Sequence, residues 1–482
     1  MFVSYAAKCE LFMKKSYYAA LLLAFASTVA YGQRYLGVAT GNYNTLNTMY
    51  VNPANLGGCN EKIGVNLFSF NMGVDNSLGT ISSIGNIMKT LNSGDSGSTQ
   101  NIFTYSNREK FSMMLPAVEI RGPGVLYRIN SSHTVALTTR VRAINEFNNF
   151  DRTLYKTITQ PSLAAGTNSI TAQNFNWTAH LWSEIGFSYG GVIVNTDPMQ
   201  VKVGATVRYL MGIGYLGLKG KNLDVAYTTG SDSFRATNSD IEFGSNAQSL
   251  ENAVSNGITT DKLFGGESGG TGFGADLGVV ISLMPEEGKG VKDGDAGSKG
   301  DDEGYKLSLS ASITDIGAIN YKTSYNVNVT GNGYLTGKGL SEHIKDYQDF
   351  RQYVITQGYS ADTGIKATKV YLPTSLIIGG DYHAYKHFYA NASLILNLAS
   401  DARFGSKYYN QFTITPRYDT KILTVGLPIT FNMLTNNMRM GIGFRVTGFF
   451  FGSDDMLALF SNNQYGLNFY VGGMVPICRG KK

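Results

Sequence analysis

The chain has 482 residues, of which 16% are charged and 57 are glycine, together with 30 tyrosines and 26 phenylalanines. The net charge of +5 is too small and too dispersed for a nucleic-acid-binding protein, and the abundant aromatic residues exclude a disordered chain. Low charge with abundant glycine and tyrosine also argues against a typical cytosolic α/β enzyme, which leaves a large all-β protein.

Residues 1–32 have the pattern of a secretory signal peptide. A basic segment begins at Met13, an apolar run extends from Tyr17 to Val29, and Ala30-Tyr31-Gly32 is a small-x-small cleavage site. We therefore expect translation to start at Met13 and cleavage to fall before Gln33. The alternative, an N-terminal membrane anchor, is disfavoured by the short apolar run. No later segment has about 18 consecutive apolar residues, so an exported chain is either soluble or a β-barrel.

Period-2 alternation of apolar and polar residues is the main signal in the rest of the chain. In the segment from Met199 to Tyr215, apolar residues occupy the odd positions, and Lys202, Thr206 and Arg208 occupy even ones. The same pattern recurs in residues 273–283, 305–314, 423–431, 438–446 and 467–475. These segments are about 10–14 residues long, enough to cross a bilayer, whereas strands of a soluble sandwich have about 5–6 residues. The alternation therefore predicts a transmembrane antiparallel β-barrel over residues 63–476.

Turns and connections give the strand number. Short turns are expected near residues 130–132, 195–198, 384–386 and 419–420, and long connections at 150–173, 218–271 and 323–370. This is the outer-membrane pattern, in which the short turns are periplasmic. The segments number about 13, and an even number is needed to return the chain to the periplasm. One strand is therefore missed or overcounted, around residues 447–463 or before Phe111, and we expect 14.

Two connections have a composition of their own. Residues 285–304, rich in Asp, Gly and Lys, are expected to form a mobile acidic loop. Residues 340–358 have one apolar stripe at helical spacing, with Ser341 as N-cap and Gly358 as C-cap. They predict a loop helix over one mouth of the barrel, and a tail is expected at 477–482.

The segment Asn52-Pro53-Ala54 lies shortly after the expected mature N-terminus. It resembles the corresponding segment of the FadL/TodX superfamily of fatty-acid transporters and of the PorV, PorQ and PorP/SprF barrels. Segments such as 312–317, 381–383, 415–418 and 451–455 resemble an uncharacterised Bacteroidota outer-membrane family. The resemblance implies a 14-stranded barrel in which residues 33–62 form a plug containing Asn52, Pro53 and Ala54.

Isolated charges fall on the faces that the alternation places inside the barrel, because a charge facing lipid costs several kcal/mol. They form either a permeation path or a structural network that ties the plug to the wall, and we favour the network. These lumen residues are Glu119, Arg121, Arg140, Arg142, Arg208, Asp276, Arg439 and Arg445.

Two cysteines remain in the expected mature chain, Cys59 before the first strand and Cys478 after the last. Closing a barrel brings these strands together in an oxidising compartment, so a Cys59–Cys478 disulfide is allowed if the Cα atoms lie within about 7 Å. No catalytic motif has supporting context, and His383 and His387 flank an expected turn. We therefore expect no enzymatic activity, no cofactor and no metal.

The sequence leaves two main functions open. The first is a passive outer-membrane channel or transporter for a hydrophobic or small amphipathic solute, as the resemblance implies. The second is a non-transporting scaffold linked to secretion or surface attachment, which would use loops 218–271 and 323–370. The expected partners are outer-membrane lipid with either a hydrophobic small molecule or secretion and surface proteins. A soluble secreted β-protein is a third reading.

Overall fold

The structure is a computed structural model. It describes residues 35–83, 86, 103–153, 155, 167–196, 198–228, 233–246, 269–285, 304–343, 347–401, 403–461 and 464–479. The expected signal peptide and nearly all of the expected acidic loop lie outside the described residues.

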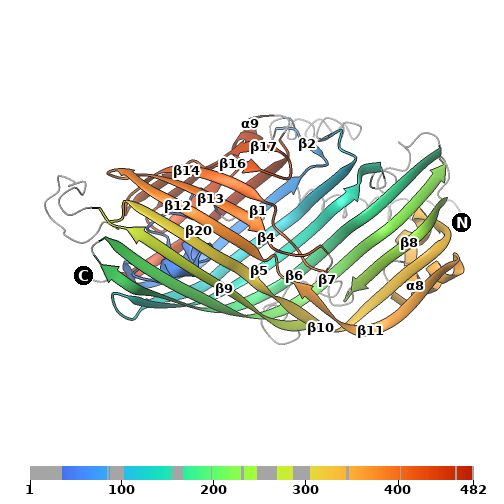
Figure 1. The fold of residues 1–482 in the computed structure, drawn as a ribbon, viewed down its shortest axis with the longest axis horizontal. Helices are drawn as coiled ribbons and strands as arrows, with labels where there is room; N and C mark the ends of the chain where they lie inside the picture. Colours follow the sequence, from blue (N-terminus) through green and yellow to red (C-terminus); the bar gives the residue numbers. More distant parts are fainter. Residues whose placement is uncertain are drawn as a thin grey trace, which may run out of the picture.

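One antiparallel sheet closes on itself and forms the barrel (Figure 1). Closure is made by β1 (Glu61–Asn76), which pairs with β4 (Lys110–Arg128) on one side and with β20 (Gly466–Arg479) on the other. The remaining strands of the sheet are β5 (His133–Asp151), β6 (Thr167–Thr196), β7 (Met199–Thr228), β8 (Ser233–Ser245), β9 (Gly270–Leu283), β10 (Leu307–Thr336), β11 (Tyr359–Tyr371), β12 (Ser375–Tyr385), β13 (Phe388–Asn397), β14 (Gln411–Asp419), β15 (Leu423–Gly426), β16 (Ile429–Asn432), β17 (Asn437–Met440), β18 (Ile442–Val446) and β19 (Phe449–Ser453).

The ring has fourteen strand positions, as the sequence predicts. The sheet contains 18 described strands, and four pairs of them share one position each: β8 with β9, β11 with β12, β15 with β16, and β17 with β18. For example, β8 and β9 pair with opposite halves of both β7 and β10. The expectation of about 14 strands is therefore confirmed.

The strands on one side of the barrel are much longer than those on the other, and they extend into regions that were expected to be loops. Strands β6, β7 and β10 have 30 residues each, whereas β13 and β14 have 10 and 9. Regions 218–271 and 323–370, expected to be long loops, therefore contain much strand, which is a correction. The C-terminal half of β7 pairs with β8, and the C-terminal half of β10 pairs with β8 and β11. Bulges hide these strands in the sequence, because each bulge reverses the period-2 pattern.

The connection between β10 and β11 contains two helices rather than the single expected one. They are α7 (Gly337–His343) and α8 (Tyr347–Thr356), so Ser341 lies inside α7 and is not an N-cap. Gly358 has a positive φ of 98° just after α8, as a helix-ending glycine does. Phe350 and Val354 of α8 are buried in an apolar core inside the tall part of the wall, and Figure 1 shows α8 beside β8 at that end.

The outer face of the barrel is apolar over most of its circumference. Exposed side chains include Phe187 on β6, Val207 on β7, Phe273 on β9, Phe412 on β14 and Phe469 on β20. An apolar exterior around a polar interior is the pattern of a barrel in a lipid bilayer. Among the described residues, no helix combines the length and the apolar character that a membrane span requires.

The remaining elements are short. They are α2 (Thr45–Thr48), η1 (Pro53–Leu56), β2 (Gly79–Ile81), β3 (Phe103–Tyr105) and α9 (Leu457–Phe460). The last barrel strand continues through Arg479, so it takes in three residues of the expected C-terminal tail.

Candidate functional site

The Asn-Pro-Ala segment lies inside the barrel and begins a short 3-10 helix, η1. The side chain of Asn52 accepts a hydrogen bond from the backbone N–H of Ala54 at 2.9 Å, which caps the helix, and Pro53 occupies its first position. The amide nitrogen of Asn52 donates to the carbonyl oxygens of Val279 and Ala311, at 3.0 and 3.2 Å. The motif therefore shapes the plug and binds it to the backbone of β9 and β10.

Three glycines in a row across the wall pack against this segment. Gly190 on β6 pairs with Gly204 on β7, which pairs with Gly278 on β9. A Cβ atom at Gly204 would lie 2.3 Å from the carbonyl carbon of Pro53, and one at Gly278 would lie 2.0 Å from Oδ1 of Asn52. We call Gly190, Gly204 and Gly278 the glycine row. The plug crosses the strands along this row, where only glycine allows so close an approach.

A wall arginine is held between two tyrosines of the plug. The guanidinium of Arg121 on β4 lies 4.1 Å from the ring centroid of Tyr35 and 4.1 Å from that of Tyr50. Arg121 also donates to Oδ1 of Asn47 at 3.3 Å. A desolvated cation between aromatic faces is stabilised by about 2 kcal/mol per contact. Arg121 thus provides a second contact between the wall and the plug, on a different strand from the three glycines of the glycine row.

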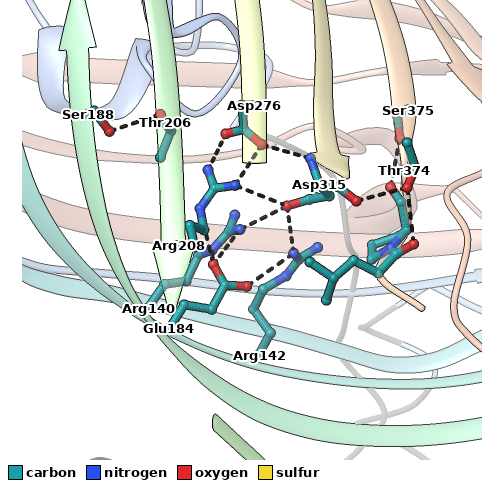
Figure 2. Close-up of polar contacts among 12 residues, drawn as sticks. Arg140, Arg142, Glu184, Ser188, Thr206, Arg208, Asp276, Asp315, Thr374 and Ser375 are labelled. Carbon is teal, nitrogen blue, oxygen red and sulfur yellow. Dashed lines mark hydrogen bonds and ion pairs between the residues drawn. The ribbon is translucent and has the colours of Figure 1, made fainter. Parts of the chain in front are cut away.

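Charged residues beside the plug form a continuous ion-pair cluster, most of which is drawn in Figure 2. Nη2 of Arg140 lies 2.7 Å from Glu184 and 2.9 Å from Asp315, and Nη1 of Arg142 lies 3.1 Å from Asp315. Arg208 donates from both terminal nitrogens to Asp276, one at 2.6 Å. Arg121 and Glu119 extend the cluster toward the plug. We call this set the charged belt: Glu119, Arg121, Arg140, Arg142, Glu184, Arg208, Asp276 and Asp315.

The charged belt contains four arginines and four carboxylates, so its formal charge is zero when all are ionised. Most of its side chains are buried, and Asp276 has no exposed surface at all. Burying charges costs several kcal/mol per ion, which good partner geometry offsets. A neutral, fully paired belt is what a structural network requires, whereas a selective ion path would present an excess of one sign.

Two lumen arginines of the predicted set belong to other clusters. Nη2 of Arg439 lies 2.6 Å from Asp75 on β1, and Nε of Arg445 donates to Thr424 at 2.9 Å, near Asp419. The residues of the predicted lumen set are therefore divided among separate groups in the structure. The six others on that list lie together in the charged belt.

Two members of the charged belt, Glu184 and Asp315, are not among the lumen residues predicted from the sequence. Glu184 shares its face of β6 with Gly186 and Ser188, so the alternation could have identified it. Asp315 could not be found in this way, because it has a positive φ of 57° at a register shift between Ile313 and Ile316. The bulge turns Asp315 into the lumen beside Thr314.

Cys59 is a buried free thiol in the structure, so the possible disulfide with Cys478 stays a prediction. Its Sγ lies 3.4 Å from Oγ1 of Thr134 and 3.5 Å from the carbonyl oxygen of Glu61, which satisfies the thiol without a partner sulfur. The backbone of Cys478 pairs with Ile63, and its side chain lies outside the described residues. The Cys59 side chain packs in the apolar core between the plug and the wall.

We expect Cys59 to resist alkylation in the folded barrel. Burial raises the pKa of the Cys59 thiol to about 12, so almost no reactive thiolate exists at pH 8. Iodoacetamide at pH 8 should leave Cys59 unmodified in detergent-folded protein and should modify it after denaturation without reductant. Peptide mass spectrometry measures both. A Cys59 that reacts only after reduction would show that the disulfide forms after all.

Two cavities adjoin beyond the charged belt. One, of about 300 Å³, is lined by the inward residues Asn148 and Asn176 and by the connection after β13. The other, of about 470 Å³, opens on the outer side of the wall at β9, β10 and β11. Both include Tyr371, Thr374 and Arg403, at the break between β11 and β12. The two cavities thus meet across an interruption in the wall, which the β13–β14 connection fills.

These features define a transmembrane β-barrel with an internal N-terminal plug. The chain belongs to a family of unknown function (DUF5723), whose model matches residues 53–454. No curated protein matches it.

Several solved barrels are similar to the chain. The toluene transporter TbuX of Ralstonia pickettii has 10% identity and a TM-score of 0.38, with 89% of this chain and 93% of that chain covered. The toluene transporter TodX of Pseudomonas putida has 10% identity and a TM-score of 0.34, with 93% and 97% covered. A FadL homologue of Pseudomonas aeruginosa has 10% identity and a TM-score of 0.32, with 94% and 98% covered. All three TM-scores lie below 0.5, so the barrel assignment rests on the strand pairing of this chain.

Proposed function

We propose that the protein is a passive outer-membrane channel for a small amphipathic or hydrophobic solute. The closed barrel, its apolar exterior and the expected signal peptide support this location. The observation that carries the transport proposal is the pair of adjoining cavities, which together lead from the outer side of the wall toward the lumen. Their linings combine hydroxyl, amide and charged groups with Leu372 and Leu398, which suits a solute with both polar and apolar parts.

The β13–β14 connection separates the two cavities. The backbone N–H of Tyr371 donates to the carbonyl of Phe404 at 2.8 Å, and Gly405 forms a bridge with Tyr371, so the connection is fixed to the edge of β11. The Phe404 ring is buried and packs against Gly217 of β7 and Gly244 of β8. Phe404 thus fills the space beside the break. The plug and the charged belt obstruct the neighbouring part of the lumen, since Thr374, which lines both cavities, donates to the carbonyl oxygen of Asp315 in the belt. Solute would cross only when both barriers open.

Replacing Phe404 by a smaller residue should raise the permeability of the barrel to small solutes. Phe404→Ala removes a buried ring and leaves a cavity beside the break, so flux of a small amphipathic solute such as 6-aminohexanoate should rise several-fold. Liposome swelling with the purified, reconstituted barrel measures this flux. Phe388→Ala, on the exposed outer face of β13, is the matched control and should leave the flux unchanged.

The same assay distinguishes the second candidate function, a non-transporting scaffold. The tight packing of the plug and the charge balance of the belt favour that function. If neither the wild type nor Phe404→Ala exceeds protein-free liposomes, while both show the heat-modifiable gel mobility of a folded barrel, the channel proposal is wrong. Secretion or surface proteins would then become the partners to seek.

A further inference from the structure

The wall cavity presents cations without a balancing carboxylate. Lys369 on β11 and Arg403 line it, both exposed, and none of its lining residues is acidic. In the part of the chain that the structure describes, neither side chain forms an ion pair. The inner cavity differs, because Lys407 there is paired with Asp401 at 2.6 Å. The wall cavity is therefore an unneutralised positive site.

The remaining polar groups of the cavity are arranged around these cations. Thr271 on β9 pairs with Asn320 on β10, which pairs with Lys369 on β11, so the three residues form one row across the wall. Arg403 lies 4.7 Å from the ring centroid of Tyr371, which holds the guanidinium over the cavity. An ammonium, a guanidinium, a hydroxyl and an amide together suit the oxygens of a phosphate group.

The cavity lies at the edge of the apolar band. Phe273 pairs with Ala318 next to the row of Thr271, Asn320 and Lys369. The Phe273 side chain is 68% exposed. Aromatic residues at such a boundary mark the level of lipid headgroups. The small residues Gly272, Gly317 and Ala318 make the hollow there. The site thus faces a membrane surface, at the border of the apolar band that lies away from the tight turns, and the taller part of the wall continues beyond it.

From this geometry we infer that the wall cavity binds the phosphate-bearing headgroup of a lipid in the leaflet at the long-connection end. Lys369 and Arg403 contact the phosphate, Thr271 and Asn320 contact neighbouring headgroup oxygens, and the acyl chains lie along Phe273. Basic pockets at this level in membrane proteins bind anionic headgroups in the same way. The inference rests on the membrane placement proposed above and does not require that the barrel transports a solute.

Photocrosslinking tests the site directly. Folded barrel in detergent is incubated with phosphatidic acid that carries a diazirine close to the headgroup, irradiated, and mapped by peptide mass spectrometry. We expect adducts in residues 359–371 and 398–410, and an at least fivefold lower yield there in the double variant Lys369→Ala/Arg403→Ala. Lys369→Arg should retain most of the yield. The double variant Lys306→Ala/Lys386→Ala, at the tight-turn end, is the matched control and should leave it within twofold.

Each alternative has its own result. Adducts confined to the tight-turn rim, or unchanged yield in Lys369→Ala/Arg403→Ala with normal heat-modifiable mobility, would overturn the inference. Complete competition by millimolar inorganic phosphate would indicate a free-anion site and overturn the lipid assignment. Equal labelling by a phosphatidylcholine probe would show that the charge of the headgroup does not select the occupant, and this would also overturn the inference. Solute flux in liposomes is a separate readout, so loss of this site and loss of the channel proposal are distinguishable.

Discussion

Replacing Arg208 by alanine should destabilise the barrel by about 3–5 kcal/mol, because it leaves a buried carboxylate without its partner. Arg208 donates two hydrogen bonds to Asp276, whose side chain has no exposed surface, and lies 3.3 Å from Glu184. Its loss also changes the charged belt from neutral to −1. We expect a lower urea midpoint and a smaller fraction of fast-migrating, unboiled protein on gels.

A second substitution should restore part of the loss. Asp276→Asn in the Arg208→Ala background removes the uncompensated charge. In the wild type, the backbone N–H of Asp315 donates to the Asp276 carboxylate at 2.7 Å, and the amide oxygen of the asparagine can still accept this hydrogen bond. The double variant should therefore recover at least half of the lost stability. Lys202→Ala is the control, because Lys202 lies on the same strand and the same face and is only partly buried. It should change the stability by no more than about 0.5 kcal/mol.

This cycle also separates the two interpretations of the lumen charges. If the belt serves permeation, Arg208→Ala assembles normally and changes only the flux. If the belt is structural, the single variant loses stability and the double variant regains it. The neutral, buried arrangement supports the structural interpretation, with Arg121 as its contact to the plug.

Period-2 alternation, in segments long enough to cross a bilayer, predicted the barrel, because lipid outside and polar groups inside impose opposite demands on successive residues. The same alternation assigned Arg140, Arg142 and Arg208 to the inward face, and a count of about 13 segments together with the need for an even number gave 14 strands. The alternation fails wherever a bulge reverses the pattern. Asn238, with a φ of 53°, and the register shifts around Asn222 interrupt β7 and β8, so the tall part of the wall was expected to be loop.

The site itself depended on information that no local pattern contains. Gly190, Gly204 and Gly278 are far apart in sequence and form a row only because the registers of β6, β7 and β9 bring them together. Each glycine alone looks like an ordinary small lumen residue. The plug motif was recognisable from the residues Asn52, Pro53 and Ala54, but its path across the glycine row was not, because strand register is set by the whole sheet.

Gly204→Val should dislodge the plug from the wall while leaving the barrel intact. A Cβ at this position would lie 2.3 Å from the backbone of Pro53, and backbone cannot yield as a flexible side chain can. Valine is otherwise favourable in a strand. Overpacking of this kind costs about 1–3 kcal/mol, which raises the undocked fraction of the plug roughly 5- to 150-fold. Chymotrypsin should then cleave at Leu46 or Tyr50, both buried in the wild type, at a correspondingly higher rate.

The control for this substitution is Gly473→Val on β20, because no atom lies within 4 Å of a Cβ built there. Its plug should remain as resistant to chymotrypsin as that of the wild type. Equal resistance in Gly204→Val would contradict the role of the glycine row in docking the plug. Combined with Phe404→Ala, Gly204→Val opens both barriers that the proposed route contains, so the double variant should exceed either single variant in liposome flux. If the plug becomes cleavable but the flux does not rise, the plug supports the barrel without gating a path, and the scaffold becomes the better account of this protein.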